Sequence, residues 1–200
     1  MKTSKAVLYG LLRPMLTVFI KHKYKATVIG KENIPKKGPV ILCGNHTNNM
    51  DCLLLGSCTK RTIYYMAKKE LHIGLKKHFF RAVGTIPIDR KASSNPDARN
   101  AALDVLSDGK VIGIFPEGTI NRTDDIIMPF KFGAVSLAQK SGATVVPFAI
   151  VGSYNDKNLI IEFSKPYQIK SKNLEKENNI LMRKVTKLIV KNRKRIYGKV

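Results

Sequence analysis

His46 and Asp51 are the residues whose types and spacing most directly indicate chemistry. His46 follows an apolar run at 40–43 and a Gly44-Asn45 turn, so its imidazole is expected at the carboxyl edge of a sheet, where α/β proteins keep their sites. Asp51 comes five residues later, at the start of an expected helix. At this spacing a carboxylate can accept a hydrogen bond from one imidazole nitrogen and leave the other nitrogen as a base.

The sequence offers no protein nucleophile to accompany this pair. It has no GxSxG elbow, and Cys43, Cys52 and Cys58 do not stand in the context of a catalytic thiol. A base without a nucleophile suits direct transfer, in which His46 removes a proton from a substrate hydroxyl and that oxygen attacks an activated acyl carbonyl. A structural histidine at a strand end and a chance HxxxxD pattern are the competing interpretations.

A metal site is a further alternative for His46, since His and Asp are both metal ligands. His72 and His78 have no spacing to His46 that indicates a shared site, and no third ligand is evident. The three cysteines form no CxxC pair, so neither a zinc knuckle nor a disulfide framework is supported. We therefore expect no metal.

Two further motifs follow apolar runs and are expected at the same edge of the sheet. In FPEGT (115–119) the proline and glycine favour a fixed turn that presents Glu117 on a loop. GTIPIDR (84–90) ends a short strand with Arg90, whose planar guanidinium can hold a phosphate through two hydrogen bonds. A polar turn and a solvated surface charge are the corresponding structural interpretations.

Short β-branched runs alternate with stretches of helical period along the chain. Strands are expected at 39–43, 62–66, 84–88, 110–115 and 144–151, with two more at 26–30 and 159–163. Helices are expected at 51–58, 70–81, 96–107 and 132–141, the last closed by Gly142. This alternation predicts an α/β fold with a central mixed, largely parallel sheet flanked by helices.

The composition limits the number of domains and the kind of partner. With 200 residues, 44% of them hydrophobic, the chain can bury one sizeable core but is short for two. It carries 36 Lys and Arg against 14 Asp and Glu, a formal charge of +22. Nucleic acid and an acidic lipid surface both fit this charge. The chain has no RNP motif and no helix-turn-helix signature, which argues against nucleic acid.

The N-terminal run 6–20 is apolar and has lysines on both sides. Arg13 and Pro14 interrupt it, and it is shorter than the roughly 20 apolar residues of a transmembrane helix. We expect an interfacial helical anchor over 1–24, with packing on the domain's own core as the alternative. At the other end, 179–200 has the period of a basic amphipathic helix, for which membrane contact and core packing both remain open.

Several motifs occur in a fixed order: NHTNNMD (45–51), AKKEL (67–71), GTIPIDR, FPEGT and VVPF (145–148). Together they resemble the 1-acylglycerol-3-phosphate O-acyltransferase family, the glycerolipid acyltransferases with the HxxxxD motif. The resemblance covers roughly residues 38–150, and the combination is far more specific than any one motif. It makes 25–200 an acyltransferase domain, and it implies an α/β fold with an N-terminal membrane-binding helical segment.

The resemblance also implies a role for each matching residue. It makes His46 the general base and Asp51 its partner. Pro147 matches a proline that helps shape the acyl-donor side. The residues implied in acceptor binding are Lys68, Arg90, Glu117, Gly118 and Thr119.

One position departs from the family pattern. The family often reads FPEGTR, but here Ile120 takes the place of the arginine and Arg122 lies two residues further on. Either Arg122 supplies the charge from a shifted loop, or the acceptor is recognised differently.

The implied activity is transfer of a fatty acyl group from acyl-CoA or acyl carrier protein to the free hydroxyl of 1-acylglycerol 3-phosphate, giving phosphatidic acid. The same chemistry on another lysophospholipid or on glycerol 3-phosphate is the first alternative. A non-catalytic basic module that binds membrane or nucleic acid is the second. The expected partners are the lysophospholipid, the acyl donor and an anionic membrane surface, with no cofactor and no nucleic acid. The expected location is the cytoplasmic face of a membrane, peripheral or monotopic.

Overall fold

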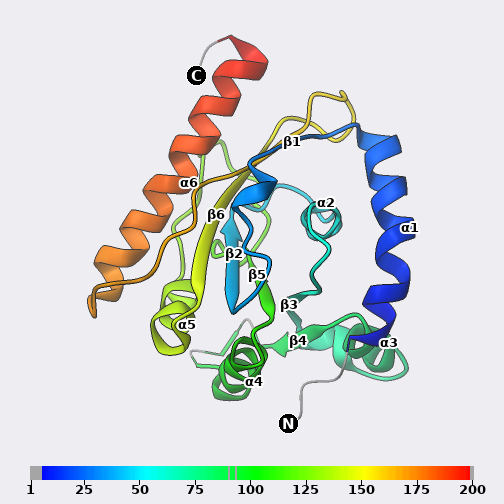
Figure 1. The fold of residues 1–200 in the computed structure, drawn as a ribbon, viewed down its shortest axis with the longest axis vertical. Coiled ribbons are helices and arrows are strands. Elements are labelled where there is room, and N and C mark those ends of the chain that lie inside the picture. The colour runs from blue at the N-terminus through cyan, green and yellow to red at the C-terminus, as the bar shows by residue number, and fades with distance from the viewer. Residues whose placement is uncertain (1–5, 90, 93, 199–200) are drawn as a thin grey trace.

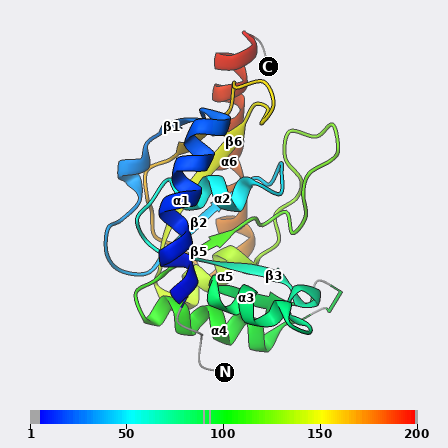
Figure 2. The same cartoon turned by 90° about the vertical axis from the view of Figure 1, so that its right-hand side faces the viewer.

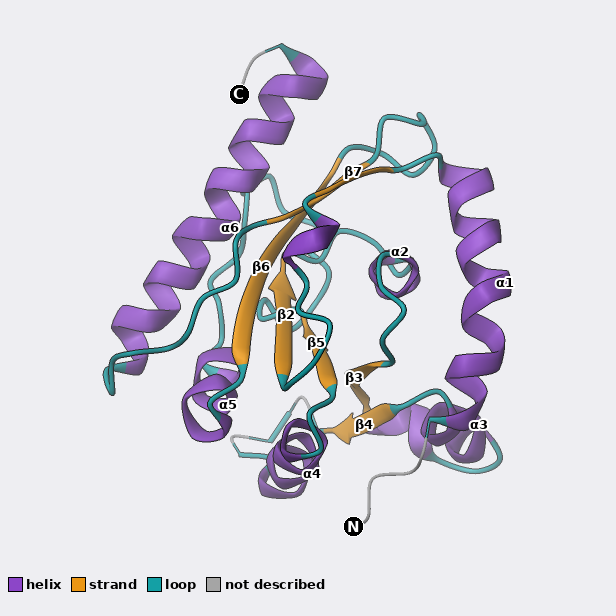
Figure 3. Ribbon diagram, viewed as in Figure 1, coloured by secondary structure: helices purple, strands orange, loops and turns teal. Residues whose placement is uncertain are grey.

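The computed structural model describes residues 6–89, 91–92 and 94–198. This part of the chain contains a seven-stranded sheet with the strand order β1-β7-β6-β2-β5-β3-β4 (Figure 3). The strands are β1 (Thr27–Ile29), β2 (Val40–Gly44), β3 (Ile63–Lys68), β4 (Thr85–Ile88), β5 (Val111–Ile114), β6 (Thr144–Val151) and β7 (Ile160–Phe163). The helices are α1 (Val7–Tyr24), α2 (Asp51–Ser57), α3 (Lys76–Ala82), α4 (Pro96–Ser107), α5 (Gly133–Ser141) and α6 (Leu174–Tyr197), with short 3₁₀ turns η1 (Lys31–Asn33) and η2 (Lys69–His72).

The strands from β2 to β6 all run in the same direction, and β7 is antiparallel to β6. The carboxyl ends of five strands therefore meet at one edge of the sheet. Every residue of β2 is buried, as expected for a central parallel strand that is covered on both faces. The predicted mixed, largely parallel sheet is confirmed.

Helices cover both faces of this sheet, which gives three layers (Figure 1). On one face α4, α5 and α6 pack against side chains such as Ile41 and Cys43 of β2. On the other face α1 and α2 pack against the alternate β2 residues Val40 and Leu42. This alternation follows from the pleat of a strand, in which successive side chains point to opposite faces.

One helix prediction was wrong. In place of a single helix over 70–81, the structure has η2 and α3 separated by residues 73–75. Gly74 has a φ of +61°, in the left-handed region, and this conformation cannot continue a right-handed helix. By contrast α4 has the predicted bounds, because Pro96 occupies the first turn and its alanines and leucines bury one face.

The C-terminal helix α6 begins five residues before its predicted start, at an N-cap formed by Asn173, whose side chain accepts a hydrogen bond from the Lys176 amide. Its apolar side packs on the core through Leu181, Val185 and Ile189. The core-packing alternative therefore describes this helix. Figures 1 and 2 place α6 and α1 on opposite faces of the sheet. In the described ranges, no helix has the length and apolarity needed to cross a membrane.

Candidate active site

The candidate site lies at the edge where the parallel strands end. His46 stands two residues after β2, Phe115 follows β5, and Lys68 is the last residue of β3. Asn45 fastens the loop after β2 to the neighbouring strand, since its side-chain amide donates to the Ile150 carbonyl and accepts from the Ile150 amide, both at 2.8 Å. His46 is thus held on a loop that is tied directly to the sheet.

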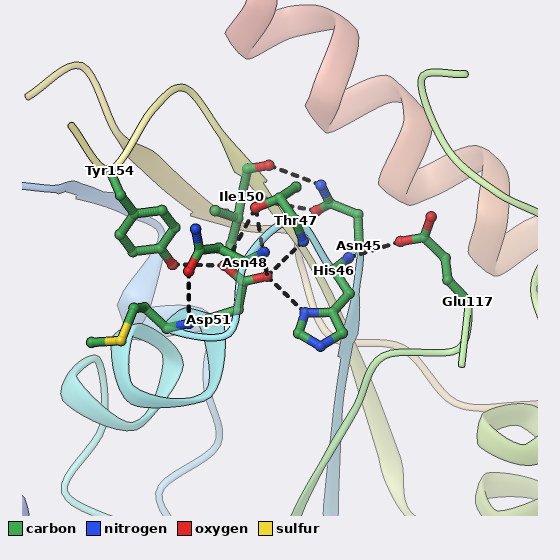
Figure 4. Close-up of polar contacts among 9 residues, drawn as sticks. Asn45, His46, Thr47, Asn48, Asp51, Glu117, Ile150 and Tyr154 are labelled. Carbon is green, nitrogen blue, oxygen red and sulfur yellow. Dashed lines mark hydrogen bonds and ion pairs between the residues drawn. The ribbon is translucent and has the colours of Figure 1, made fainter. Parts of the chain in front are cut away.

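The ring of His46 contacts both Asp51 and Phe115. Its Nδ1 lies 2.8 Å from Asp51 Oδ2 (Figure 4). The ring also stacks on Phe115, with centroids 4.2 Å apart. A carboxylate only accepts hydrogen bonds, so Nδ1 carries the proton and Nε2 keeps a lone pair. Among the described residues Nε2 has no hydrogen-bond partner, and His46 lines a cavity. This is the geometry of a general base with its orienting carboxylate.

Asp51 is fully buried, and its two oxygens are surrounded by donors. Oδ2 accepts from the backbone amides of Thr47 and Asn48 at 2.6 and 2.8 Å, in addition to His46. Oδ1 accepts from the Tyr154 hydroxyl at 2.6 Å. Asp51 is also the first residue of α2, where the amides of the first turn favour a negative charge. These contacts fix the carboxylate in one orientation.

The backbone of His46 is held on both sides by the FPEGT loop. Its amide donates to Glu117 Oε1 at 2.7 Å, and its carbonyl accepts from the Asn121 amide at 2.8 Å. The second oxygen of Glu117 accepts from the Met128 amide at 2.9 Å, and burial raises the pKa of this carboxyl group. Glu117 is only 3% exposed, and its two hydrogen bonds connect the His46 loop to the segment around Met128.

A cavity of about 1100 Å³ adjoins His46. Its lining includes the predicted residues Lys68, Gly118, Thr119 and Arg122, as well as Ile120. Arg90 lies outside the described residues, although its neighbour Asp89 lines the cavity and is paired with Lys69 at 2.6 Å. Glu117 and Pro147 are not among the lining residues, and Pro147 lies within β6 opposite Cys43.

Two residues at the site were missed from the sequence. Tyr154 lies shortly after the carboxyl end of β6, the strand next to β2. A polar aromatic residue just after a strand end was the feature of the sequence that could have indicated it. Lys131 lines the cavity beside Gly118 and stands two residues before the start of α5. No motif around Lys131 indicated its position, because the long loop 115–132 brings it back to the sheet edge.

Another histidine, His72, lies away from the His46 loop. His72 contacts Thr85, with its Nε2 2.9 Å from the Thr85 hydroxyl oxygen, and belongs to η2 and not to the His46 loop. In the part of the chain that the structure describes, no three His, Cys, Asp or Glu side chains are grouped as a metal site would require. The candidate site consists of the His46–Asp51 pair and the cavity that His46 lines.

The family comparison agrees with this geometry. The acyltransferase family model matches residues 25–151, a range that contains His46, Asp51 and the FPEGT loop. A solved structure, the 1-acyl-sn-glycerophosphate (LPA) acyltransferase PlsC from Thermotoga maritima, matches with a TM-score of 0.70 and 23% identity. That match covers 89% of this chain and 78% of the other, and it supports the fold.

Two curated relatives from different organisms have the same name as each other. The 1-acyl-sn-glycerol-3-phosphate acyltransferase of Borreliella burgdorferi is 36% identical over 140 residues, and that of Bacillus subtilis is 32% identical over 157 residues. The matches cover 69% and 76% of this chain. They span about half of the Borreliella protein, 54%, and 75% of the Bacillus protein. The resemblance inferred from the motifs is confirmed, and the chain belongs to the acyltransferase family.

Proposed function

We propose that this protein transfers a fatty acyl group from an acyl thioester, carried by coenzyme A or acyl carrier protein, to the free hydroxyl of 1-acylglycerol 3-phosphate. The product is phosphatidic acid. The observation that carries this proposal is the His46–Asp51 pair, in which His46 lines a cavity whose wall contains both basic and apolar side chains. The names of the curated relatives support the same acceptor.

The reaction follows from the orientation of the His46 ring. Nε2 accepts the proton of the acceptor hydroxyl while the hydroxyl oxygen attacks the thioester carbonyl. Asp51 keeps the proton on Nδ1 and stabilises the imidazolium that forms. When the tetrahedral intermediate collapses, the C–S bond breaks, and the departing thiolate takes the proton from His46. General-base assistance of this kind typically contributes about 10²–10⁴-fold to the rate.

The basic lining residues of the cavity suit the acceptor phosphate. Arg13, Lys68, Arg122 and Lys131 line the cavity, as do Gly133 and Ala134 at the start of α5. Cationic side chains and the amides at a helix N-terminus both favour a phosphate group. Arg122 lines the cavity together with Ile120, which supports Arg122 as the residue that replaces the arginine of the family motif.

The apolar lining residues suit an acyl chain. Tyr9, Leu12 and Leu16 of α1 and Leu53 of α2 are among them, so the N-terminal helix contributes to the wall of the cavity. The outward side of α1 exposes Val7, Leu11, Met15 and Val18, each about 70% exposed. A helix with one face on the protein and an exposed apolar face fits an interfacial anchor. We therefore assign the protein to the cytoplasmic face of a membrane, bound peripherally through α1.

Mass spectrometry of the reaction products tests this proposal. Purified protein is given acyl-CoA or acyl carrier protein loaded with the same chain, together with 1-acylglycerol 3-phosphate, another lysophospholipid or glycerol 3-phosphate. Phosphatidic acid as the main product supports the proposal, and preference for another acceptor supports the alternative with the same chemistry. The His46→Ala protein serves as the control, and equal product from it would remove His46 as the base.

A further inference from the structure

An exposed apolar cluster lies between η2 and α3, well outside the catalytic residues. Ile73 is 67% exposed, Leu75 is 91% exposed and Phe79 is 50% exposed. Among the described residues, Leu75 has the largest exposed fraction of any large apolar side chain. Single exposed apolar residues are ordinary on protein surfaces, but a cluster on one short segment marks an interaction site.

This segment, residues 73–79, lies on the same side of the molecule as α1. Figures 1 and 2 show α3 beside the N-terminal half of α1, and the two helices contact each other. Two elements that are separate in the sequence therefore present exposed apolar side chains on one side of the fold. The helix α6 lies on the opposite side of the sheet (Figure 1).

Within α1 and the segment 71–88 all charged residues are basic, and the acidic residues Glu70 and Asp89 stand just outside that segment. Neither 7–24 nor 71–88 contains an aspartate or a glutamate. Lys76 and Lys77 are exposed on α3 next to Leu75, and Lys21 and Lys23 are exposed in the last turn of α1. Exposed apolar residues bordered by lysines match the interface of an anionic bilayer. A second copy of the chain fits less well, because a symmetric contact would bring these lysines together.

The cavity connects the two elements to the site. Leu12 and Leu16 of α1 and Phe79 and Phe80 of α3 are all part of its lining, and Phe79 is at the same time half exposed. We propose that residues 73–79 form a second membrane-inserting element that, together with α1, flanks the cavity on the bilayer side. A lipid acceptor then passes from the bilayer to His46 between two apolar walls. The insertion follows from exposure and charge, and only the passage of the acceptor rests on the proposed function.

Vesicle flotation tests the insertion. The variants Leu75→Ser and Ile73→Ser/Leu75→Ser are compared with wild type on vesicles of phosphatidylglycerol and phosphatidylcholine, and on phosphatidylcholine alone. Since burial of a leucine-sized side chain is worth a factor of about ten or more, each substitution should weaken binding to the anionic vesicles by roughly that factor. Tyr197→Ser is the matched control, because Tyr197 is 53% exposed on α6 and should have no effect. The two variants should unfold at the wild-type temperature, since Ile73 and Leu75 are exposed.

Unchanged binding of the double variant to anionic vesicles would overturn the proposal. A wild-type dimer that the double variant loses in light scattering, with vesicle binding unaltered, would assign the cluster to a protein interface instead. A third measurement separates this inference from the proposed function. The double variant should lose turnover on a long-chain acceptor embedded in vesicles but keep it on a short-chain acceptor dissolved as monomers. Equal loss on both would place Ile73 and Leu75 in the site itself, against the proposal. If wild type uses neither acceptor, the proposed function fails, and flotation still decides the insertion.

Discussion

Tyr154 donates a hydrogen bond of 2.6 Å to Asp51 Oδ1, across 103 residues of sequence. Burial, together with the nearby Asp51 carboxylate, raises the pKa of Tyr154 well above its ordinary range, so the phenol remains a donor. Its ring also contacts Tyr24, the last residue of α1, edge to face at 5.0 Å. The carboxylate that orients His46 is therefore held by a residue that also packs on the N-terminal helix.

We expect Tyr154→Phe to lower kcat roughly tenfold while the KM values for both substrates stay unchanged. The phenylalanine ring preserves the contact with Tyr24 but removes the hydrogen bond to Asp51. A hydrogen bond to a charged group is worth about 1.5–3 kcal/mol. Only part of this free energy should contribute to stabilising the transition state, which corresponds to the smaller loss expected in kcat. Steady-state kinetics beside a thermal unfolding curve measures the effect. Wild-type kcat in a protein that is merely less stable would make Tyr154 a purely structural residue.

Replacement of either member of the catalytic pair should abolish most of the activity. His46→Ala removes the base, and Asp51→Asn offers the His46 ring an amide in place of a carboxylate. Each should reduce kcat by roughly 10²–10⁴-fold, and the double variant should be little worse than either single variant, since the two act as a unit. Circular dichroism checks that both proteins fold. Additive losses would show that Asp51 acts independently of His46.

The basic residues of the cavity should affect the acceptor and not the donor. Lys131→Ala and Arg122→Ala are each expected to raise the acceptor KM by roughly tenfold or more, because a charge-assisted hydrogen bond is worth about 1.5–3 kcal/mol. Lys140→Ala is the matched control, as Lys140 is exposed near the end of α5 outside the cavity lining. Kinetics with each substrate varied in turn measures the effect. A rise in the donor KM instead would move these residues to the donor site.

A methyl group added at Gly44 should destabilise the fold. A Cβ at this position would overlap the carbonyl oxygen and the ring of Phe148 in the paired strand β6. Crowding of this kind costs about 1–3 kcal/mol, which urea unfolding of Gly44→Ala should show. Gly133→Ala is the comparison, since a Cβ there meets no atom within 4 Å and should leave the stability nearly unchanged or slightly higher. Equal stability of the two variants would contradict the contact with Phe148.

Two of the cysteines should resist alkylation in the folded protein. Burial raises the pKa of Cys58 to about 12 and the pKa of Cys43 beyond that, so neither forms the reactive thiolate near pH 8. Peptide mapping after iodoacetamide treatment should find both residues unlabelled until urea is added. Rapid labelling of either in the native state would contradict the raised pKa values.

The sequence predicted well those features that depend on neighbouring residues. The five-residue spacing of His46 and Asp51 placed them correctly together, because a strand end, a turn and a helix start leave few alternatives over so short a span. The closure of α5 at Gly142, which has a φ of +65°, follows in the same way from a local conformational preference. The incorrect prediction of one helix over 70–81 also came from a local pattern. The apolar period of this segment favours a helix, and one glycine, Gly74, was not enough to change that prediction.

The features that could not be predicted depend on distant contacts. Tyr154 and Lys131 meet the His46 and FPEGT loops only because β6 lies next to β2 and the loop 115–132 folds back over the sheet edge. The buried orientation of Glu117 likewise needs the amides of His46 and Met128, which are 71 and 11 residues away. No local pattern encodes such partners, so they become visible only in the folded chain.

The loop 115–121 holds the backbone of His46 at both its amide and its carbonyl, and the same loop lines the cavity. A change in this loop, whether engineered or natural, would therefore affect both the binding of substrate in the cavity and the position of His46. If the proposed function holds, side chains at 119, 120 and 122 are the ones to exchange for a different headgroup. The length of the loop cannot be altered freely, because an insertion or deletion there would displace His46 along with this part of the cavity wall.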